Sequence, residues 1–416
     1  MSWSLSHVAS NEQARGDLDG ALARYKEGLE IRRALMAELG TPESRRDVSF
    51  ALLQVATIEH ERGDLDGALA RYEEGLEIAL ALMAELGTPH SHGYVSMLLE
   101  FIADIDKSRG DLDGALAGYE EGLEINRALM AELGTPQSRR DVSCSLEKIA
   151  RIEQSRGDLD GALAYYKEGL EIRRALMAEF GTHNCRLNLS VSLNNVAGIE
   201  QARGDLEGAL SRYEEGLEIR RALMAELGTP ESRRDVSVRL LQVASIKEMC
   251  GDIDGALARY EESLKIDRGL MAGLESPDNC YCMIISLECI ASIEQARGDL
   301  DGALAHYEES LEIQRRRSEE LATPDSLHDL VSSTQLCAGI EVSLSRAGAA
   351  LVRLESLVAQ VCLLESASDV NTLDTVAAYW ERRTEALDAL GWASEAVESR
   401  ARALAIRTRI AEMGSD

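Results

Sequence analysis

Residues 62–78 read Arg-Gly-Asp-Leu-Asp-Gly-Ala-Leu-Ala-Arg-Tyr-Glu-Glu-Gly-Leu-Glu-Ile, and close copies of this stretch recur along the chain. The alanine at the seventh place of the stretch continues in the same register to Ala350 and then to Ala396. Nine such alanines in 416 residues predict nine repeat units that fill the chain. The opening tripeptide returns with a period of 47 residues, at Arg15, Arg62, Arg109, Arg156, Arg203 and Arg297, and with Cys250 in place of the arginine in one further copy.

Each unit has the pattern of two helices, as residues 41–87 illustrate. Thr41 offers a hydroxyl that caps a first helix, and Pro42 suits its first turn. Apolar residues then recur at helical spacing as far as Gly63 and Asp64, which end the first helix and cap a second. Gly87 suits the left-handed residue that closes a helix. Neither helix can bury its apolar stripe alone, so successive pairs are expected to stack into an all-α solenoid of about nine antiparallel helix pairs.

The composition agrees with helices and excludes several classes of protein. Aromatic residues make up only 4% of the chain, which disfavours sheet, and hydrophobic residues make up 45%, enough for a core. The sequence contains no apolar run of membrane-spanning length and no signal-peptide pattern at its start, so we expect a cytoplasmic protein with reduced thiols and no membrane partner. A net charge of −29 argues against nucleic acid as a partner.

The repeat resembles the tetratricopeptide repeat (TPR). The fifth unit carries the similarity: Ser192-Leu193-Asn194-Asn195-Val196-Ala197, then Gly204-Asp205-Leu206, and then Ala209, Tyr213 and Leu217-Glu218-Ile219. The long unit is most similar to the kinesin-light-chain-type branch of the family, and we expect a bacterial source. The resemblance implies a right-handed superhelix whose first helices line a concave face. Glycines such as Gly75 depart from the family pattern, which usually has alanine there.

Regularity divides the chain into two predicted regions. Residues 1–330 comprise seven regular repeats, and residues 331–416 comprise two divergent repeats that end in a polar capping helix. The first repeat has no comparable cap, which suggests self-association through that edge. The recurring tyrosines are expected in the core at every unit: Tyr25, Tyr72, Tyr119, Tyr166, Tyr213, Tyr260 and Tyr307. Arg-Gly-Asp is interpreted as the turn between helices rather than as an adhesion motif, since Gly supplies a positive φ and Asp caps.

The second helices are nearly invariant, whereas the first helices differ from unit to unit outside their apolar positions. By resemblance to the family, these differing positions line the concave groove. The candidate binding residues, which lie in repeats two to seven, are Phe50, Leu53, Gln54, Thr57, His60, Glu61, Met97, Glu100, Phe101, Asp104, Lys107, Glu147, Lys148, Arg151, Asn194, Asn195, Gln201, Leu241, Gln242, Glu248 and Glu288. Most of the negative charge lies instead on the second helices.

A uniform frame with a varied lining predicts a non-catalytic scaffold that binds a protein or peptide segment in the groove. Neutral drift of an exposed face is the alternative explanation of the same variation. A second function implied by the resemblance is a regulatory or sensor subunit of a larger bacterial signalling or defence assembly, with a caspase-like protease or a signalling ATPase as partner.

No motif predicts chemistry. The sequence contains no Gly-rich phosphate loop, no His-Glu-x-x-His and no Gly-x-Ser-x-Gly, so no enzyme activity and no cofactor are expected. The cysteines Cys280, Cys282 and Cys289 lack a fourth zinc ligand nearby in sequence, and no metal site is predicted. The clamp by which some relatives hold chaperone tails is not expected either, because Glu100 and Glu147 stand where that clamp needs lysine.

Overall fold

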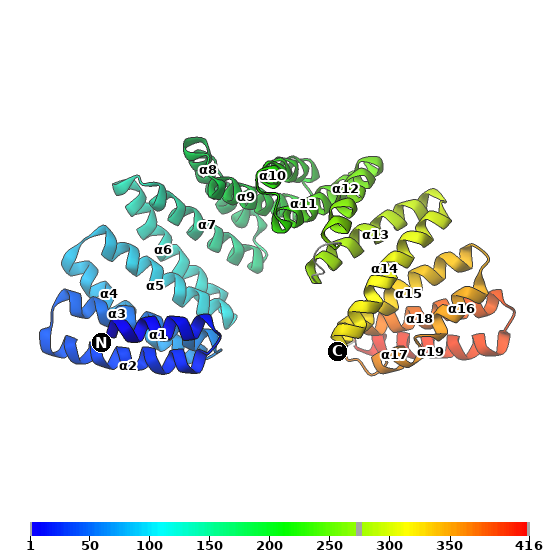
Figure 1. Ribbon diagram of the computed structural model, residues 1–416, viewed down its shortest axis with the longest axis horizontal. Coiled ribbons are helices and arrows are strands. Elements are labelled where there is room, and N and C mark those ends of the chain that lie inside the picture. The colour runs from blue at the N-terminus through cyan, green and yellow to red at the C-terminus, as the bar shows by residue number, and fades with distance from the viewer. Residues whose placement is uncertain (1, 272–276, 414–416) are drawn as a thin grey trace. The chain divides into compact units, whose positions relative to one another are not determined.

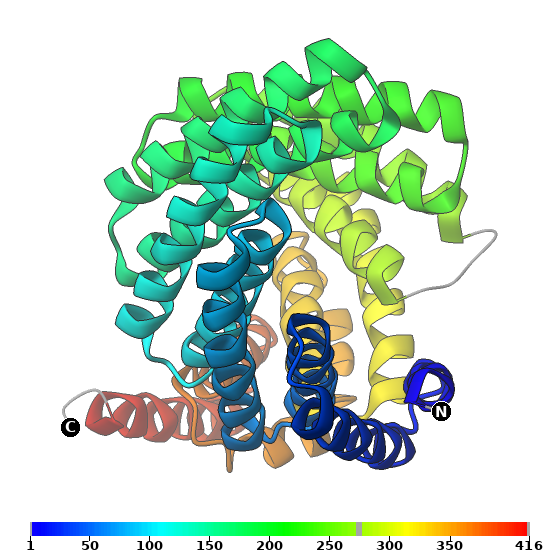
Figure 2. The same cartoon turned by 90° about the vertical axis from the view of Figure 1, so that its left-hand side faces the viewer.

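The computed structural model describes residues 2–271 and 277–413, and every regular element in these ranges is a helix. The helices follow one another in antiparallel pairs (Figures 1 and 2). In chain order they are α1 (Ser2–Ala14), α2 (Leu18–Leu39), α3 (Pro42–Glu61), α4 (Leu65–Leu86), α5 (Pro89–Ser108), α6 (Leu112–Leu133), α7 (Pro136–Arg156), α8 (Leu159–Phe180), α9 (His183–Ala202), α10 (Leu206–Leu227), α11 (Pro230–Met249), α12 (Ile253–Met271), α13 (Pro277–Arg297), α14 (Leu300–Leu321), α15 (Pro324–Ser343), α16 (Ala347–Glu355), α17 (Val358–Leu364), α18 (Val370–Ala389) and α19 (Ala393–Met413).

The capping signals read from the sequence are confirmed. Thr41 accepts a hydrogen bond from the backbone N–H of Ser44 at the start of α3, and Asp64 accepts one from Gly67 at the start of α4. Gly87 ends α4 with a φ of 55°, in the left-handed region. Between the two helices Gly63 has a φ of 82°, which explains the glycine of Arg-Gly-Asp.

The arginine of Arg-Gly-Asp has a role that the sequence did not reveal. Arg62, which follows α3, forms an ion pair with Asp19 in the first turn of α2, the second helix of the preceding repeat, at 2.7 Å. Arg156 and Asp113 repeat the contact at 3.0 Å. The motif therefore closes a turn within one repeat and links that repeat to its predecessor.

The chain divides into two compact units, Met1–Arg212 and Tyr213–Asp416. Within the first unit, α3, α5 and α7 form one layer and α4, α6 and α8 form the other (Figure 1). The first helices α3, α5 and α7 each pack against their own second helix and against the second helix of the preceding repeat. In the second unit, the short helices α16 and α17 replace a single second helix.

The core is built from the residues that the repeats share. Ala21, Leu22, Tyr25 and Leu29 of α2 belong to one buried cluster together with Val48, Ala51, Leu52, Val55 and Ile58 of α3. All seven recurring tyrosines are buried, with 1% to 6% of their surface exposed, so the core assignment of this row is confirmed. Gly75 packs closely against α3, since the hydroxyl of Ser49 donates a hydrogen bond to the Gly75 carbonyl at 2.8 Å, but a Cβ at Gly75 would make only ordinary contacts.

Among the described helices, none alone is both long and apolar enough to cross a bilayer. The pair α16–α17, bent by 57°, meets the length and composition condition only when its two halves are taken together.

Candidate protein-binding surface

The candidate residues lie on α3, α5, α7, α9, α11 and α13, and we call the solvent-accessible side of these helices the first-helix surface. None of the candidate side chains is buried. Phe50, Glu61, Lys107 and Arg151 are exposed, and the other candidates are half-buried. By contrast, the apolar residues that the first helices share, such as Leu52, Leu146 and Leu193, are 0% exposed. The candidate positions, which differ between repeats, are therefore accessible, although a buried first-helix position such as that of Leu98 and Ser192 differs as well.

Three candidate residues on neighbouring first helices form one ionic cluster. Lys148 Nζ of α7 lies 3.2 Å from Glu100 Oε2 and 3.1 Å from Asp104 Oδ2, both on α5. The hydroxyl of Tyr119 donates a hydrogen bond to the other oxygen of Asp104 at 2.5 Å. Lys148 also lies over the Tyr119 ring, 5.3 Å from its centroid. Two carboxylates thus hold one ammonium group, and the cluster is acidic by one charge.

Burial and charge act in opposite directions on the Lys148 ammonium. Burial alone would lower the pKa of Lys148, but Glu100 and Asp104 together outweigh burial and raise it. Burial and then the hydrogen bond to Asp104 raise the pKa of the Tyr119 hydroxyl. Both groups therefore keep their protons at neutral pH, and Lys148 is not a free cation for a ligand.

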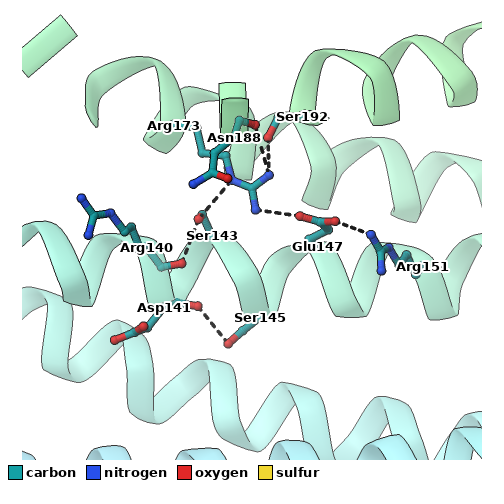
Figure 3. Close-up of polar contacts among 9 residues, drawn as sticks. All are labelled: Arg140, Asp141, Ser143, Ser145, Glu147, Arg151, Arg173, Asn188 and Ser192. Carbon is teal, nitrogen blue, oxygen red and sulfur yellow. Dashed lines mark hydrogen bonds and ion pairs between the residues drawn. The ribbon is translucent and has the colours of Figure 1, made fainter. Parts of the chain in front are cut away.

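A second network surrounds Arg173 of α8, whose side chain is only 9% exposed (Figure 3). Its Nη2 donates to Glu147 at 2.6 Å, its Nη1 donates to Ser192 at 2.7 Å, and its Nε donates to Ser143 at 3.3 Å. Glu147 also accepts a hydrogen bond from Arg151 at 2.5 Å. The guanidinium group of Arg173 therefore joins α8 to its own first helix, α7, and to the next first helix, α9.

Beside this network lies a cavity of about 190 Å³ between α7, α8 and α9. Leu176 and Cys185, both buried, contribute its apolar lining, and Cys144 is an exposed thiol on its wall. The lining residues are Gln137, Arg140, Asp141, Ser143, Cys144, Arg173, Leu176, Cys185 and Asn188. Cys144 occupies a groove position of the fourth repeat, but the other lining residues are not among the candidates derived from the sequence, since a cavity depends on side-chain volumes across three helices.

Aromatic and apolar candidates form part of the same surface on α3 and α5. Phe101 stacks on Tyr72, with ring centroids 5.3 Å apart and planes at 7°. Thr57 lies 3.3 Å from the Tyr72 hydroxyl and donates to the carbonyl of Leu53 at 2.9 Å. Phe50 is 47% exposed and offers the most accessible aromatic ring on this surface of the first unit's described residues. Leu53 and Phe101 pack at the edge of the core, so only part of each side chain is accessible to a ligand.

The remaining candidates of the first unit divide by their contacts. Gln54 accepts a hydrogen bond from Arg32 of α2 at 3.3 Å, and Glu61 accepts one from Gln13 of α1 at 2.7 Å. Asn195 Nδ2 is buried without a hydrogen-bond partner in the described chain, while Asn194 and Gln201 are hydrogen-bonded or paired. Met97 and His60 are half-buried, and Lys107 is exposed.

In the second unit, most of the polar candidates also have internal partners. Gln242 accepts a hydrogen bond from Arg239 at 2.6 Å, and Glu248 accepts one from Tyr260 at 3.1 Å. Glu288 accepts one hydrogen bond from Ser310 and one from Ser333, each at 2.9 Å. Leu241 packs at the edge of the core. Much of the variety on the first-helix surface is thus matched to neighbouring helices.

Variation also occurs on the second helices, which the sequence analysis treated as uniform. One buried position per repeat changes its residue type: Arg32, Ala79, Asn126, Arg173, Arg220, Asp267 and Gln314. Side chains at this position contact first helices, as when Asn126 Nδ2 donates to Ser145 Oγ of α7 at 3.0 Å. A comparison of the second helices residue by residue would have revealed it. The first helices are therefore not the only carriers of differences between repeats.

The described residues contain no group of three or more His, Cys, Asp or Glu side chains arranged to hold a metal ion. The surface offers hydrogen-bonding groups, short ionic clusters and one cavity, which suit the non-covalent binding of a polypeptide. Paired helices with such a surface define a helical-repeat binding protein.

Comparison with known proteins identifies the repeat. Two models described as "Tetratricopeptide repeat" match the chain, one at residues 141–222 and the other at residues 2–37 and 284–320. The chain contains tetratricopeptide repeats in these ranges, and its fold is similar to that of kinesin-light-chain-like repeat proteins. Such repeats generally bind proteins or peptides and are usually non-catalytic. No curated protein matches the sequence.

Several solved structures are similar in fold. BtubC (BKLC) from P. vanneervenii is 22% identical, with a TM-score of 0.48 over 62% of this chain and 94% of that one. A kinesin light chain from Podosopora anserina with nearly identical TPR-like repeats is 18% identical, with a TM-score of 0.39 over 54% of this chain and 94% of that one. A signal transduction ATPase with a tetratricopeptide repeat sensor, PH0952 from Pyrococcus horikoshii, is 14% identical, with a TM-score of 0.47 over 90% of this chain and 53% of that one.

Proposed function

We propose that the chain is a non-catalytic scaffold that binds a segment of a partner protein along the first-helix surface. One observation carries the proposal: the candidate side chains, which differ between first helices, are accessible, whereas the apolar residues that these helices share, such as Leu52 and Leu146, are buried. Neutral drift of an exposed face would leave the variable side chains without matching neighbours. Lys148 and Glu147 instead each have two ionic partners, so drift alone does not explain the variation.

The cavity between α7, α8 and α9 supports a more specific form of the proposal. Its volume of about 190 Å³ suits one large apolar side chain, and Leu176 and Cys185 give it an apolar lining. Gln137 and Asn188, both exposed, supply amide groups that suit a peptide backbone. We propose that the partner segment inserts a leucine-, methionine- or phenylalanine-type side chain here.

Electrostatics argue against a strongly charged ligand. The Lys148 cluster has a net charge of −1, and the group formed by Arg173, Arg151 and Glu147 has a net charge of +1. These opposite charges lie on adjacent helices, so a segment of mixed polarity fits better than a basic or acidic tract. Self-association at the edge of the first repeat is a separate part of the proposal.

A randomised peptide library displayed on phage, selected against the full chain, would test the main proposal. Selected peptides would be measured by fluorescence anisotropy against Phe50→Ala, Lys107→Ala, Arg151→Ala and Asn188→Ala, which sample α3, α5, α7 and α9 in turn. We expect at least one of these substitutions to weaken binding about tenfold or more.

Glu77→Ala is the matched control, because Glu77 is exposed on the second helix α4. Binding that resists all four substitutions, or that responds equally to Glu77→Ala, would contradict the proposed surface, as would a selection that enriches no peptide. The alternative function, a sensor subunit of a protease or ATPase assembly, stays a prediction that co-purification from the native host would test.

A further inference from the structure

Inside the chain, two apolar residues of a second helix pack against the first helix of the next repeat, as α2 and α14 show. Leu304 and Leu311 of α14 are 7% and 2% exposed, and both belong to the buried cluster that contains Leu330 and Cys337 of α15. Leu22 and Leu29 of α2 occupy the same positions in the first repeat and pack with Val55 of α3 in the same way. This pair of residues therefore marks the contact between one repeat and the next.

The same two positions on α19 are open to solvent. Val397 and Leu404 each follow Leu304 and Leu311 by 93 residues, the spacing that also relates Ala396 to Ala303. Val397 is 61% exposed and Leu404 is 67% exposed. On α19, which the sequence predicts to be a polar capping helix, these two exposed apolar residues hold the positions that α2 and α14 use for the contact between repeats.

The complementary half of this contact is open on α1. Val8 precedes Val55 by one 47-residue period, and Val55 is 0% exposed because the preceding second helix, α2, covers it. Val8 is 44% exposed. The surface of α1 thus presents what the second helix of a preceding repeat would cover.

Charges at the two edges complement each other as well. Inside the chain, the arginine that most turns carry pairs with an aspartate in the first turn of the preceding second helix, as Arg203 does with Asp160 at 2.6 Å and Arg346 does with Asp301 at 3.0 Å. Arg15, the first arginine of the series, has no ion-pair partner among the described residues. Glu395, in the first turn of α19 and one residue from the corresponding aspartate position, has none in the described chain either.

We propose that α1 of one copy stacks on α19 of a second copy, so that the contact between repeats continues between molecules. Val8 would then lie against Val397 and Leu404, and Arg15 would lie near Glu395. A second copy of the chain fits this surface because the contact between repeats inside the chain uses the same residue types in the same register. A contact of this kind is heterologous, and it generates open chains of molecules or a closed ring.

Sedimentation velocity and light scattering over a range of concentrations would test the contact on the full chain. The wild-type protein is expected to increase in mean mass with concentration. Val8→Asp removes the α1 half of the contact, and the double variant Val397→Asp/Leu404→Asp removes the α19 half, so each is expected to remain monomeric. Leu133→Asp is the matched control, since Leu133 is 45% exposed on α6, which belongs to neither α1 nor α19, and this variant should associate like the wild type.

A mixture of the two edge variants gives the sharpest result. Each variant keeps the half that the other lacks, so an equimolar mixture is expected to form dimers and nothing larger. The substituted side chains are solvent-exposed, so each variant is expected to fold, and circular dichroism would verify this. A wild-type chain that stays monomeric throughout, or edge variants that associate as the control does, would overturn the proposal.

Discussion

Arg173 and Glu147 occupy the positions that Ala79 and Leu53 occupy two repeats earlier, so that an ion pair at one repeat junction replaces an apolar contact at another. A third position changes with them: Ser192, which accepts a hydrogen bond from Arg173, stands where the earlier junction has Leu98. Ala79 and Leu98 are buried in one apolar cluster, with Leu53 packed against it. Equivalent positions are thus filled by a polar network at one junction and by an apolar cluster at the other.

The first prediction concerns replacement of the polar network around Arg173 by the apolar residues of the earlier junction. Glu147→Leu alone leaves the nearly buried Arg173 without its carboxylate and is expected to lower the free energy of unfolding by about 2–4 kcal/mol. The triple variant Arg173→Ala/Glu147→Leu/Ser192→Leu reproduces the apolar junction and is expected to lie within about 1 kcal/mol of the wild type. Urea denaturation followed by circular dichroism measures both. A triple variant less stable than the single one would show that the positions do not act together.

The second prediction concerns Asp267, which is fully buried at the corresponding position of α12. Its Oδ1 accepts a hydrogen bond from Ser237 at 2.7 Å, and its Oδ2 has no partner in the described residues. Burial raises the pKa of Asp267 to about 6. In the unfolded chain the group titrates near 3.9, so the folded state binds the proton more tightly and loses stability as the pH rises from about 4 to about 6.

Asp267→Asn removes this charge and is expected to stabilise the chain by about 2–3 kcal/mol at pH 7, with the gain disappearing near pH 4. The junction at Asn126 shows that an asparagine fits, since its amide donates to Ser145, and Ser286 holds the equivalent place beside Asp267. Denaturation at a series of pH values gives the profile. A stability difference that stays constant between pH 4 and pH 7 would show that folding leaves the pKa of Asp267 unchanged, which would contradict the prediction.

The third prediction concerns the end of α14. Ala322 closes this helix with a φ of 49°, whereas Gly40, Gly87, Gly134 and Gly181 close the corresponding helices of the first unit. A side chain is strained in the left-handed region, so Ala322→Gly is expected to raise the free energy of unfolding by about 0.5–1 kcal/mol. Gly134→Ala, the reverse change at a matched site, should lower it by a similar amount. Equal effects of the same sign would contradict the explanation.

The fourth prediction uses a natural reporter in the cavity. Cys144 is an exposed thiol, whereas Cys185 and Cys337 are buried, and burial raises the pKa of Cys337 to about 12. Maleimide is therefore expected to modify Cys144 before Cys185 and Cys337, as peptide mapping by mass spectrometry would show. In a variant with Cys250→Ser and Cys362→Ser, which removes the other exposed thiols, the Cys144 adduct should reduce peptide binding.

The reverse arrangement provides the control for that experiment. A variant with Cys144→Ser and Cys362→Ser that keeps Cys250 carries its adduct at the end of α11, a helix that contributes no residue to the lining of the cavity. Peptide binding is expected to survive this modification. Loss of binding in both variants would mean that the adduct acts through the fold and not through the cavity.

Local sequence signals were sufficient for the helices and their ends. Thr41, Asp64 and Gly87 act within a few residues of their own position, so their roles follow from neighbours in the sequence. The recurring tyrosines were placed correctly in the core because a 47-residue period repeats the same environment. The family followed from the same period.

The availability of each surface residue could not be predicted in this way. Lys148 has the sequence appearance of a free groove cation, but Glu100 and Asp104 on the preceding first helix neutralise it. The partners are 48 and 44 residues apart in sequence, and only the angle between neighbouring repeats brings them within 3.2 Å. The cavity beside Cys144 depends likewise on three helices at once.

The changing buried position on the second helices has a consequence for how the chain finds its correct order. Repeats this alike could exchange neighbours during folding, or recombine in the gene, with little loss at most positions. A slip by two units toward the N-terminus would place the guanidinium of Arg173 opposite Leu98 instead of Ser192, which accepts its hydrogen bond in the correct order. The residue type at this one position therefore helps to distinguish correct from incorrect pairings of repeats, although Arg32, Arg173 and Arg220 share it.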